Sequence, residues 1–301
     1  MKICFLAPGE IQIPPIGWGA LETVVWNLSR SLKDLGHEVF IINEKDSKLA
    51  LSQILEINPD IVHLHYGKHW EIMPKIKCRK FITTHDGSFL ESMRFHENLV
   101  RNFFYDCEFR VLTTWEKDFL LNIGISPKNI NIFANGVCYD SFSRKKTPIH
   151  DKTICLGKID PRKKQSELQS SLKNICFVGA VFDDRFNSKC SSYLGVWNRD
   201  DVYSKLTDFS NLTLLSDLEL HPLVCLEALS AGLGLVISKN ASQNLDTSKN
   251  FIDVIPEEKL HDYQYIQSVL DKNKNYCKNN RGEIFEYAKS FKWIERAKKY
   301  K

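Results

Sequence analysis

The sequence lacks the features of several protein classes. Its 301 residues contain no apolar run near the ~20 residues that a membrane-spanning helix needs. The longest candidate, residues 228–238, is short and includes Gly232 and Gly234. The formal net charge is only +4, from 41 basic and 37 acidic residues, so no nucleic-acid partner is expected. Apolar residues at 43% and charged residues at 26% exclude a disordered or collagen-like chain and predict a soluble globular protein.

The cysteines form neither a disulfide pattern nor a metal-binding one. They number nine, no C-x-x-C spacing occurs, and several, such as Cys155 and Cys176, lie inside apolar runs. Free thiols in a reducing compartment fit best, so we expect a cytoplasmic protein. His63, His65 and His69 follow one another near a predicted strand end. Their spacing is more typical of one core and one cleft histidine than of a metal site, and no metal is expected.

Short apolar runs alternate with helical patterns in two series. At ~150 residues per domain, the length predicts two domains. A polar, proline-containing stretch, residues 139–151, is predicted to link the two series. The alternation predicts an α/β protein with two Rossmann-like, doubly wound domains facing a central cleft. The expected strands of the first series are residues 2–7, 39–42, 61–65, 80–84, 109–113 and 130–133, and those of the second are 153–156, 175–178, 212–215 and 235–237. The expected helices are residues 21–35, 164–172, 200–207, 222–231 and 282–300.

We place the N-terminal domain at residues 1–145, the C-terminal domain at 146–280 and a final helix at 281–301. The final helix follows a polar stretch and carries a broad apolar stripe. Packing against the N-terminal domain is the expected use of this stripe. Peripheral docking at the cytoplasmic face of a membrane, helped by Lys298 and Lys299, is the alternative. Ligands of doubly wound sheets bind outside the carboxyl ends of strands, and three motifs lie there.

The first motif is the loop PPIGWGALE at residues 14–22, before an amphipathic helix. Gly17 and Gly19 let the backbone approach a ligand closely, and the helix N-terminus suits a phosphate. Glu22 stands where a dinucleotide fingerprint has its third glycine, and no Gly-Lys-Ser/Thr follows as in a Walker loop. The loop is therefore either a phosphate-binding turn or a plain strand-to-helix turn.

The second motif is GKIDPRKK at residues 157–164, directly after a predicted strand. Lys158, Arg162 and Lys163 bring three cations close together. Charge-assisted contacts from one or two of them suit a pyrophosphate, and a solvated turn is the alternative.

The third motif runs over residues 212–238 and contains two glutamates. A buried strand leads to a loop with Glu219, and Pro222 fits the first position of the next helix. Glu227 lies inside that helix, about 7–8 Å along its axis from the first-turn amides at ~1.5 Å per residue. This spread suits an elongated ligand, with one carboxylate on a ribose and the other on a sugar hydroxyl. The flanking strand, loop and small residues make the pair specific.

In order and spacing, these motifs resemble the family-4 retaining glycosyltransferases of GT-B fold. The resemblance covers most of the chain. Its further landmarks are Gly-His-Glu-Val at 36–39, DIVHLH at 60–65, Thr84-His85, Asn135-Gly136-Val137 and Phe291-Lys292-Trp293. Three positions depart from the family pattern: Lys158 replaces an arginine, and Lys164 and Pro222 replace glycines.

The resemblance implies transfer of a hexose from a UDP- or GDP-linked sugar to an acceptor hydroxyl in glycan or glycoconjugate synthesis. The acceptor would be a glycan, a glycoprotein or a lipid-linked group, and no cofactor or metal would be needed. An epimerase of sugar nucleotides and a catalytically weak binding or assembly subunit remain as alternatives. A dinucleotide oxidoreductase is disfavoured by the missing third glycine.

The resemblance also implies a role for single residues. His85 would lie beside the reacting sugar, and Glu219 would hold that sugar together with the amides that follow it. The expected donor-binding residues are Gly17, Gly19, Lys158, Lys163, His221, Leu223 and Glu227, with Glu227 on the ribose. The expected acceptor-binding residues are Trp18, His65 and Asp86.

Overall fold

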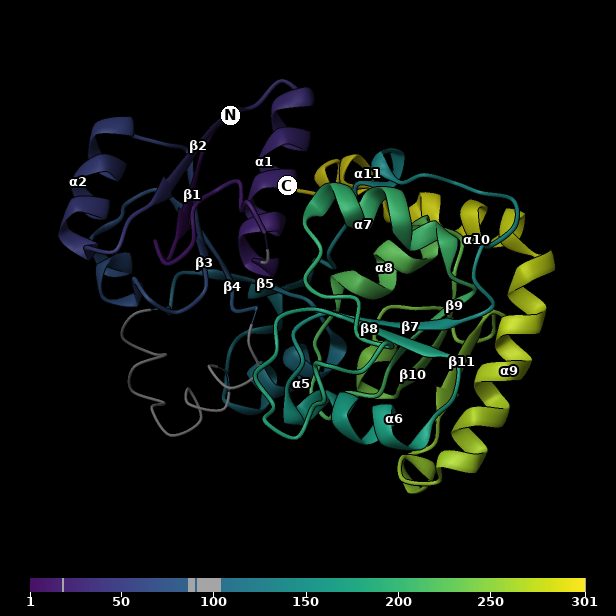
Figure 1. Cartoon of the computed structure of the whole chain (residues 1–301). Coiled ribbons are helices and arrows are strands. Elements are labelled where there is room, and N and C mark those ends of the chain that lie inside the picture. The colour runs from purple at the N-terminus through teal and green to yellow at the C-terminus, as the bar shows by residue number, and fades with distance from the viewer. Residues whose placement is uncertain (18, 86–89, 91–103, 301) are drawn as a thin grey trace. The chain divides into compact units, whose positions relative to one another are not determined.

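The structure is a computed structural model that describes residues 1–17, 19–85, 90 and 104–300. The chain divides into two compact units (Figure 1). Unit 1 consists of Met1–Gly136 and Trp293–Lys301, and unit 2 consists of Val137–Lys292. The chain therefore leaves unit 1 after Gly136 and returns to it at Trp293. The boundaries expected from the sequence, after residues 145 and 280, both lie inside unit 2.

Unit 1 is built on a parallel sheet with the strand order β2-β1-β3-β4-β5-β6. Every neighbouring pair is parallel. Strand β1, which lies between β2 and β3, is apolar from Ile3 to Ala7 without alternation, because helices cover both faces of a parallel sheet. The strands are β1 (Lys2–Ala7), β2 (Glu38–Asn43), β3 (Ile61–His65), β4 (Arg79–Thr83), β5 (Glu108–Val111) and β6 (Ile130–Ile132).

The described α-helices of unit 1 begin and end at recognisable signals. Helix α1 (Ala20–Asp34) ends just before Gly36, whose φ of +81° suits a residue without a side chain. Helix α2 (Ser47–Ile57), capped by Asp46, was not expected from the sequence. Helix α5 (Thr114–Asn122) begins with a capping box between Thr113 and Glu116. The short helix α11 (Trp293–Ala297) packs on α1 and brings the end of the chain to this unit.

Unit 2 is built on a second parallel sheet with the order β11-β10-β9-β7-β8. Two clusters of buried apolar side chains cover its two faces, because successive strand residues point to opposite sides. The strands are β7 (Thr153–Leu156), β8 (Ile175–Val178), β9 (Asn211–Leu214), β10 (Gly234–Ser238) and β11 (Ile252–Ile255). The helices are α6 (Gln165–Ser171), α7 (Arg199–Lys205), α8 (Leu223–Ser230), α9 (Tyr263–Asn279) and α10 (Arg281–Ala288).

Three local expectations differ from the structure. The stretch predicted as a linker, residues 139–151, begins with Tyr139 and Phe142 buried in the core of unit 2, because their aromatic rings find apolar partners there. The polar stretch before the final helix contains α9, which buries Ile266 and Leu270 at a spacing of one helical turn. The final helix is not continuous, because the backbone turns extended at Lys292 between α10 and α11.

Two further properties of the described residues bear on the expectations. All nine cysteines are free. Within the described part of the chain, no helix is both long enough and apolar enough to cross a membrane.

Candidate functional site

The loops that follow β7 and β9 meet at the carboxyl end of the unit 2 sheet. Lys163 lies in the first loop and Glu219 in the second, and Lys163 Nζ is 3.6 Å from Glu219 Oε1. Both side chains are largely shielded from solvent, with exposed fractions of 16% and 17%. The structure therefore brings the cation predicted for a diphosphate directly against the carboxylate predicted for a sugar.

Two glycines and a glutamine shape the first loop. Gly157 has a φ of +136°. A Cβ on Gly179, after β8, would lie 2.0 Å from the Gly157 carbonyl oxygen, so only glycine permits this approach. The Gln165 side chain stabilises the loop through two hydrogen bonds to its backbone. Its Oε1 accepts from the Asp160 N–H at 3.1 Å, and its Nε2 donates to the Lys158 carbonyl at 2.9 Å.

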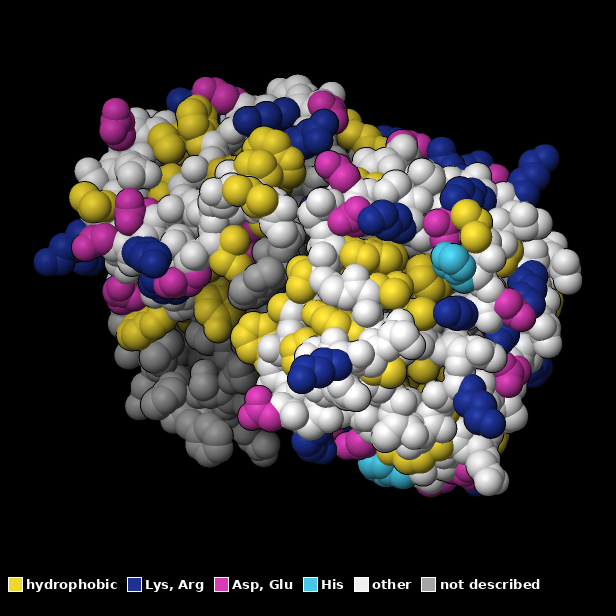
Figure 2. All heavy atoms as spheres, viewed as in Figure 1, with side chains coloured by type: hydrophobic (Ala, Val, Ile, Leu, Met, Phe, Trp, Pro, Cys, Tyr) yellow, Lys and Arg dark blue, Asp and Glu magenta, His cyan; other side chains and the backbone are white. Residues whose placement is uncertain are grey.

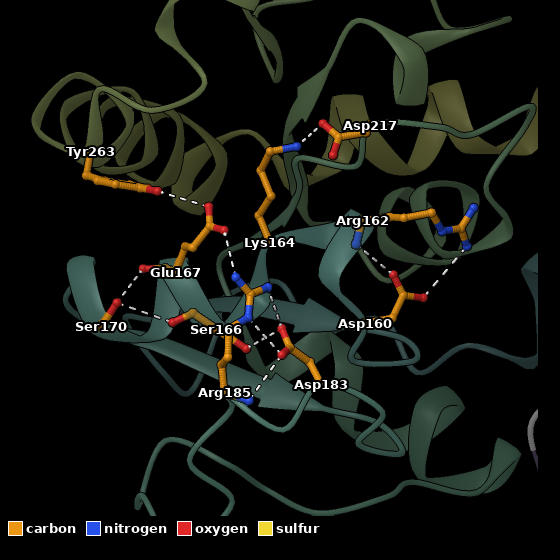
Figure 3. A network of polar contacts seen from close by, with 10 residues as sticks. All are labelled: Asp160, Arg162, Lys164, Ser166, Glu167, Ser170, Asp183, Arg185, Asp217 and Tyr263. Atoms are coloured by element: carbon orange, nitrogen blue, oxygen red, sulfur yellow. Dashed lines mark hydrogen bonds and ion pairs between the residues drawn. The ribbon is translucent and has the colours of Figure 1, made fainter.

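Two further cations of this loop, Arg162 and Lys164, take part in a polar network (Figure 3). The Lys164 ammonium forms an ion pair with Asp217 of the loop after β9. The Asp217 N–H donates to the Arg162 carbonyl at 3.0 Å. The Arg162 guanidinium lies 3.7 Å from Asp160. Lys164, which departs from the family pattern, thus ties the two loops of the candidate site together.

The same network fixes the segment after β8. Asp183 is buried and accepts from Ser166 Oγ at 2.7 Å and from two nitrogens of Arg185 at 2.9 Å (Figure 3). These hydrogen bonds from Arg185 lower the pKa of Asp183 to about 2. The carboxylate is therefore ionised throughout the neutral range and holds the segment on α6.

Lys158 takes a different direction from Lys163. Its Nζ lies 4.3 Å from the ring centroid of Phe182, a cation–π contact. Phe182 is itself exposed, as are Val181, Leu194 and Val196 of the same segment between β8 and α7. Hydrophobic side chains are visible at the surface of unit 2 in Figure 2. No sequence signal distinguished Phe182 from an ordinary loop residue.

Glu227 has a partner that the sequence analysis missed. It lies on α8 with only 8% of its side chain exposed, and its Oε1 is 2.7 Å from Nη1 of Arg199, the first residue of α7. The guanidinium also stacks 4.8 Å from the Tyr203 ring centroid and donates to the Tyr203 hydroxyl at 3.2 Å. Arg199 belongs to a helix that carried no motif, so only the fold reveals the pair.

The N-terminus of α8 lies between the two glutamates in the sequence. Pro222 is the N-cap and Leu223 the first helical residue, so the helix begins one residue later than expected. The N-cap residue makes no side-chain hydrogen bond to this end. The amides of Leu223 and Val224 are the helical donors nearest to the Glu219 loop along the chain. His221, just before them, is buried.

In unit 1, Gly19 is the N-cap of α1 with a φ of +148°. A Cβ there would lie 2.9 Å from Glu22 Oε2 and 3.1 Å from Pro15 Cβ, so the turn requires glycine. Burial raises the pKa of Glu22. Among the described residues other than its chain neighbours, no atom lies within 4 Å of a Cβ built on Gly17. Trp18 lies outside the described residues.

His65, the last residue of β3, meets His85, which lies two residues after β4. His65 Nδ1 is 2.9 Å from His85 Nε2, and the two rings stack with an interplanar angle of 19°. Burial lowers the pKa of both imidazoles, that of His85 to about 4, so both rings are neutral at pH 7. Asp86 lies outside the described residues. The acceptor role expected of His65 stays a prediction.

The remaining histidines of this region have structural partners. His63 bonds to Tyr300 and Thr83 inside the core. His69 accepts from Ser47 at 2.9 Å and donates to the Glu44 carbonyl at 2.8 Å. Among the residues that the structure describes, no three His, Cys, Asp or Glu side chains are grouped as metal ligands. The expectation of a metal-free site stays a prediction.

Glu116 is a buried acid that is hydrogen-bonded to Thr84, the residue before His85. Its carboxylate accepts from the N–H groups of Leu112 and Thr113 and from the hydroxyl of Thr84, the neighbour of His85. Burial nevertheless raises its pKa to about 7. In the sequence, Thr113 and Glu116 stand at the spacing of a capping box, which indicates the start of a helix and not a buried acid.

Comparison with known proteins gives no sequence match but many structural ones. No family model and no curated protein matches the chain. Sucrose-phosphate synthase from Thermosynechococcus elongatus matches over 100% of this chain and 97% of its own, with a TM-score of 0.76 and 11% identity. WaaG, a glycosyltransferase involved in lipopolysaccharide biosynthesis, matches over 99% and 98%, with a TM-score of 0.71 and 14% identity. Anabaena HepE, solved with UDP and glucose, matches over 100% and 98%, with a TM-score of 0.67 and 13% identity.

These likenesses extend over both units of the chain. They confirm the predicted fold class, which is the GT-B fold. This fold consists of two Rossmann-like domains, each built on a parallel sheet with flanking helices. At such low identity they establish the fold alone, and the activity has to be argued from the site.

Proposed function

We propose that this protein is a nucleotide-sugar glycosyltransferase that transfers a hexose from a UDP- or GDP-linked donor with retention of configuration. The observation that carries the proposal is the ion pair between Lys163 and Glu219 at the carboxyl ends of β7 and β9. This is the edge of the sheet at which doubly wound folds bind ligands. The UDP and UDP-glucose bound to Anabaena HepE, which has the same fold, favour a uridine nucleotide as the donor.

The ion pair suggests how donor binding prepares the sugar site. A diphosphate carries more negative charge than Glu219 and attracts the Lys163 ammonium more strongly. Once Lys163 turns to the diphosphate, the Glu219 carboxylate is released to accept hydrogen bonds from sugar hydroxyls. The donor would therefore assemble its own sugar site.

The chemistry needs a stabilised leaving group and a protected sugar cation. The bond between the anomeric carbon and the phosphate oxygen breaks, and the acceptor oxygen bonds to the same carbon from the same face. The proton of the acceptor hydroxyl passes to the departing phosphate oxygen. Lys163 and the first amides of α8 would neutralise the leaving diphosphate without a metal ion. Glu219 would face the positive charge that develops on the sugar.

The remaining residues complete the proposed assignment. Gly17 and Gly19 would let the α1 amides approach the diphosphate, and Lys158 would add a second cation. Glu227 would hold the ribose. The acceptor would be a hydroxyl of a glycan, a glycoprotein or a lipid-linked group, reached in the cytoplasm or at a membrane's cytoplasmic face.

Incubation with donor alone tests the proposal. The purified protein is mixed with UDP-glucose, UDP-galactose or GDP-mannose, and release of the nucleoside diphosphate and the identity of the sugar are measured. A transferase slowly hydrolyses its donor, and the bound donor raises the melting temperature. Isomerisation of the hexose would identify an epimerase. A raised melting temperature without turnover, even with a panel of acceptors, would identify a binding subunit.

A further inference from the structure

We propose that His65 is a positioning residue for His85. In this arrangement His65 donates from its Nδ1–H to Nε2 of His85 and thereby keeps the His85 proton on Nδ1. The proposal rests on the proposed function in one respect, that His85 acts on the donor sugar. The arrangement of the two protons is itself independent of the reaction.

The first step is the geometry of the pair. His65 is the last residue of β3 and is 1% exposed, whereas His85 follows β4 and is partly exposed. The 2.9 Å separation of His65 Nδ1 and His85 Nε2 is that of a good hydrogen bond. His65 therefore lies behind His85 and reaches a ligand only through it.

The second step is the direction of this hydrogen bond. His65 Nε2 is buried and has no hydrogen-bond partner among the described residues. A buried N–H without a partner is rarer in native proteins than a buried acceptor without one. The proton of the neutral His65 ring therefore lies on Nδ1, and His85 Nε2 is the acceptor. Since a neutral imidazole carries one proton, that of His85 lies on Nδ1.

The third step is what holds His65 in place. The His63 ring packs against it with the centroids 4.0 Å apart, and the edge of Phe5 covers it at 4.9 Å. A chain of directed hydrogen bonds fixes His63 in turn. Thr83 Oγ1 donates to the Arg110 carbonyl at 2.9 Å, so it accepts from His63 Nε2–H at 2.9 Å.

The last residue in this series of hydrogen bonds, Tyr300, comes from the C-terminal end of the sequence. Because His63 Nε2 carries the proton, His63 Nδ1 accepts from the Tyr300 hydroxyl at 2.8 Å. Tyr300 is fully buried and lies 237 residues further along the sequence. The C-terminal segment that returns to unit 1 therefore supplies the hydrogen bond that orients His63, the ring packed against His65.

The arrangement makes His85 a neutral hydrogen-bond donor and not a base. Its φ of +57° lies in the left-handed region, which is strained for a residue with a side chain. The hydrogen bond to the buried His65 and the stacking of the two rings hold the His85 ring in one orientation. An Nδ1–H in a fixed orientation suits an oxygen acceptor such as a sugar hydroxyl or a phosphate.

Two variants of the same size separate a positioning role from mere packing. In His65→Asn the amide nitrogen replaces Nδ1 and keeps a donor for His85, whereas His65→Leu has nearly the same shape and no donor. We expect His65→Leu to lower the rate of donor turnover by about tenfold or more, the scale of one lost hydrogen bond. We expect His65→Asn to stay within about threefold of the wild type, a difference of under 1 kcal/mol.

The proton positions are read directly by ¹⁵N NMR of histidine-labelled protein. The wild type and His65→Asn should show His85 protonated at Nδ1, and His65→Leu should show a mixture of tautomers. A wild-type His85 protonated at Nε2 would overturn the proposal, as would equal turnover in the two variants. The wild-type spectrum decides the question even if a variant fails to fold. If the spectrum is as expected but His85→Ala leaves turnover unchanged, the catalytic role of His85 fails and the positioning of its proton stands.

Discussion

Replacing Arg199 by Met removes the cation that faces Glu227 in unit 2. The two charges are 2.7 Å apart, and the exposed fractions of their side chains are 26% and 8%. Breaking a fully buried pair costs ~3–5 kcal/mol, and an exposed pair contributes ~0.2–1 kcal/mol. Water reaches Arg199 but hardly reaches Glu227. We therefore expect Arg199→Met to lower the free energy of unfolding by about 2 kcal/mol, between those limits.

Chemical denaturation of four proteins measures the pair itself. The wild type, Arg199→Met, Glu227→Gln and the double variant are unfolded in urea and followed by circular dichroism. Glu227→Gln in the Arg199→Met background relieves the unpaired charge, so the double variant should be more stable than the sum of the single changes predicts. We expect a coupling energy of about 1–2 kcal/mol.

Lys205 on the same helix provides a matched control. Its Nζ is also 2.7 Å from a carboxylate, that of Asp201, but the two side chains are 52% and 28% exposed. Lys205→Met should cost less than about 0.5 kcal/mol, as for exposed pairs on helices. Additivity of the Arg199 and Glu227 variants within about 0.5 kcal/mol would refute the argument that burial makes this pair strong.

Four further outcomes are expected. Lys163→Ala should weaken binding of a nucleoside diphosphate by ~1.5–3 kcal/mol in calorimetry, the scale of a charged hydrogen bond, and unchanged affinity would contradict its placement at the diphosphate. Glu219→Gln should lower kcat more than it raises the donor KM, because it loses a contact that strengthens in the transition state, whereas the exposed Glu258→Gln should match the wild type. Activity should survive EDTA, and a loss restored by manganese or magnesium would show a metal requirement. Gly179→Ala should lower the melting temperature markedly, since its Cβ would lie 2.0 Å from the Gly157 carbonyl oxygen, and a wild-type value would exclude that close approach.

The sequence determined those elements whose signals are local. Strands β1, β3, β7 and β8 have the bounds expected of them, because each is a short, mainly apolar run that is readable locally. The capping box of α5 was readable from Thr113 and Glu116 for the same reason. Helix α9 was missed because it covers its sheet with only a few apolar residues, and most of its other positions are polar.

The sequence also placed Lys163 and Glu219 in loops after predicted strands, and Glu227 in the helix that follows the second loop. The carboxyl ends of parallel strands share one edge of a sheet, which is where ligands bind. Only the tertiary structure decided which charges meet there. Lys163 faces Glu219, Lys158 faces Phe182, and Glu227 is paired with Arg199 of a helix that carried no motif.

The same holds for the histidines of unit 1. Side chains alternate along β3, so His63 and His65 lie on one face of the strand. Their partners, Tyr300 for His63 and His85 for His65, come from segments that strand order and the return of the chain bring alongside β3. Pairings of this kind leave no local pattern, because a hydrogen bond depends on atoms meeting in space and not on their separation along the chain.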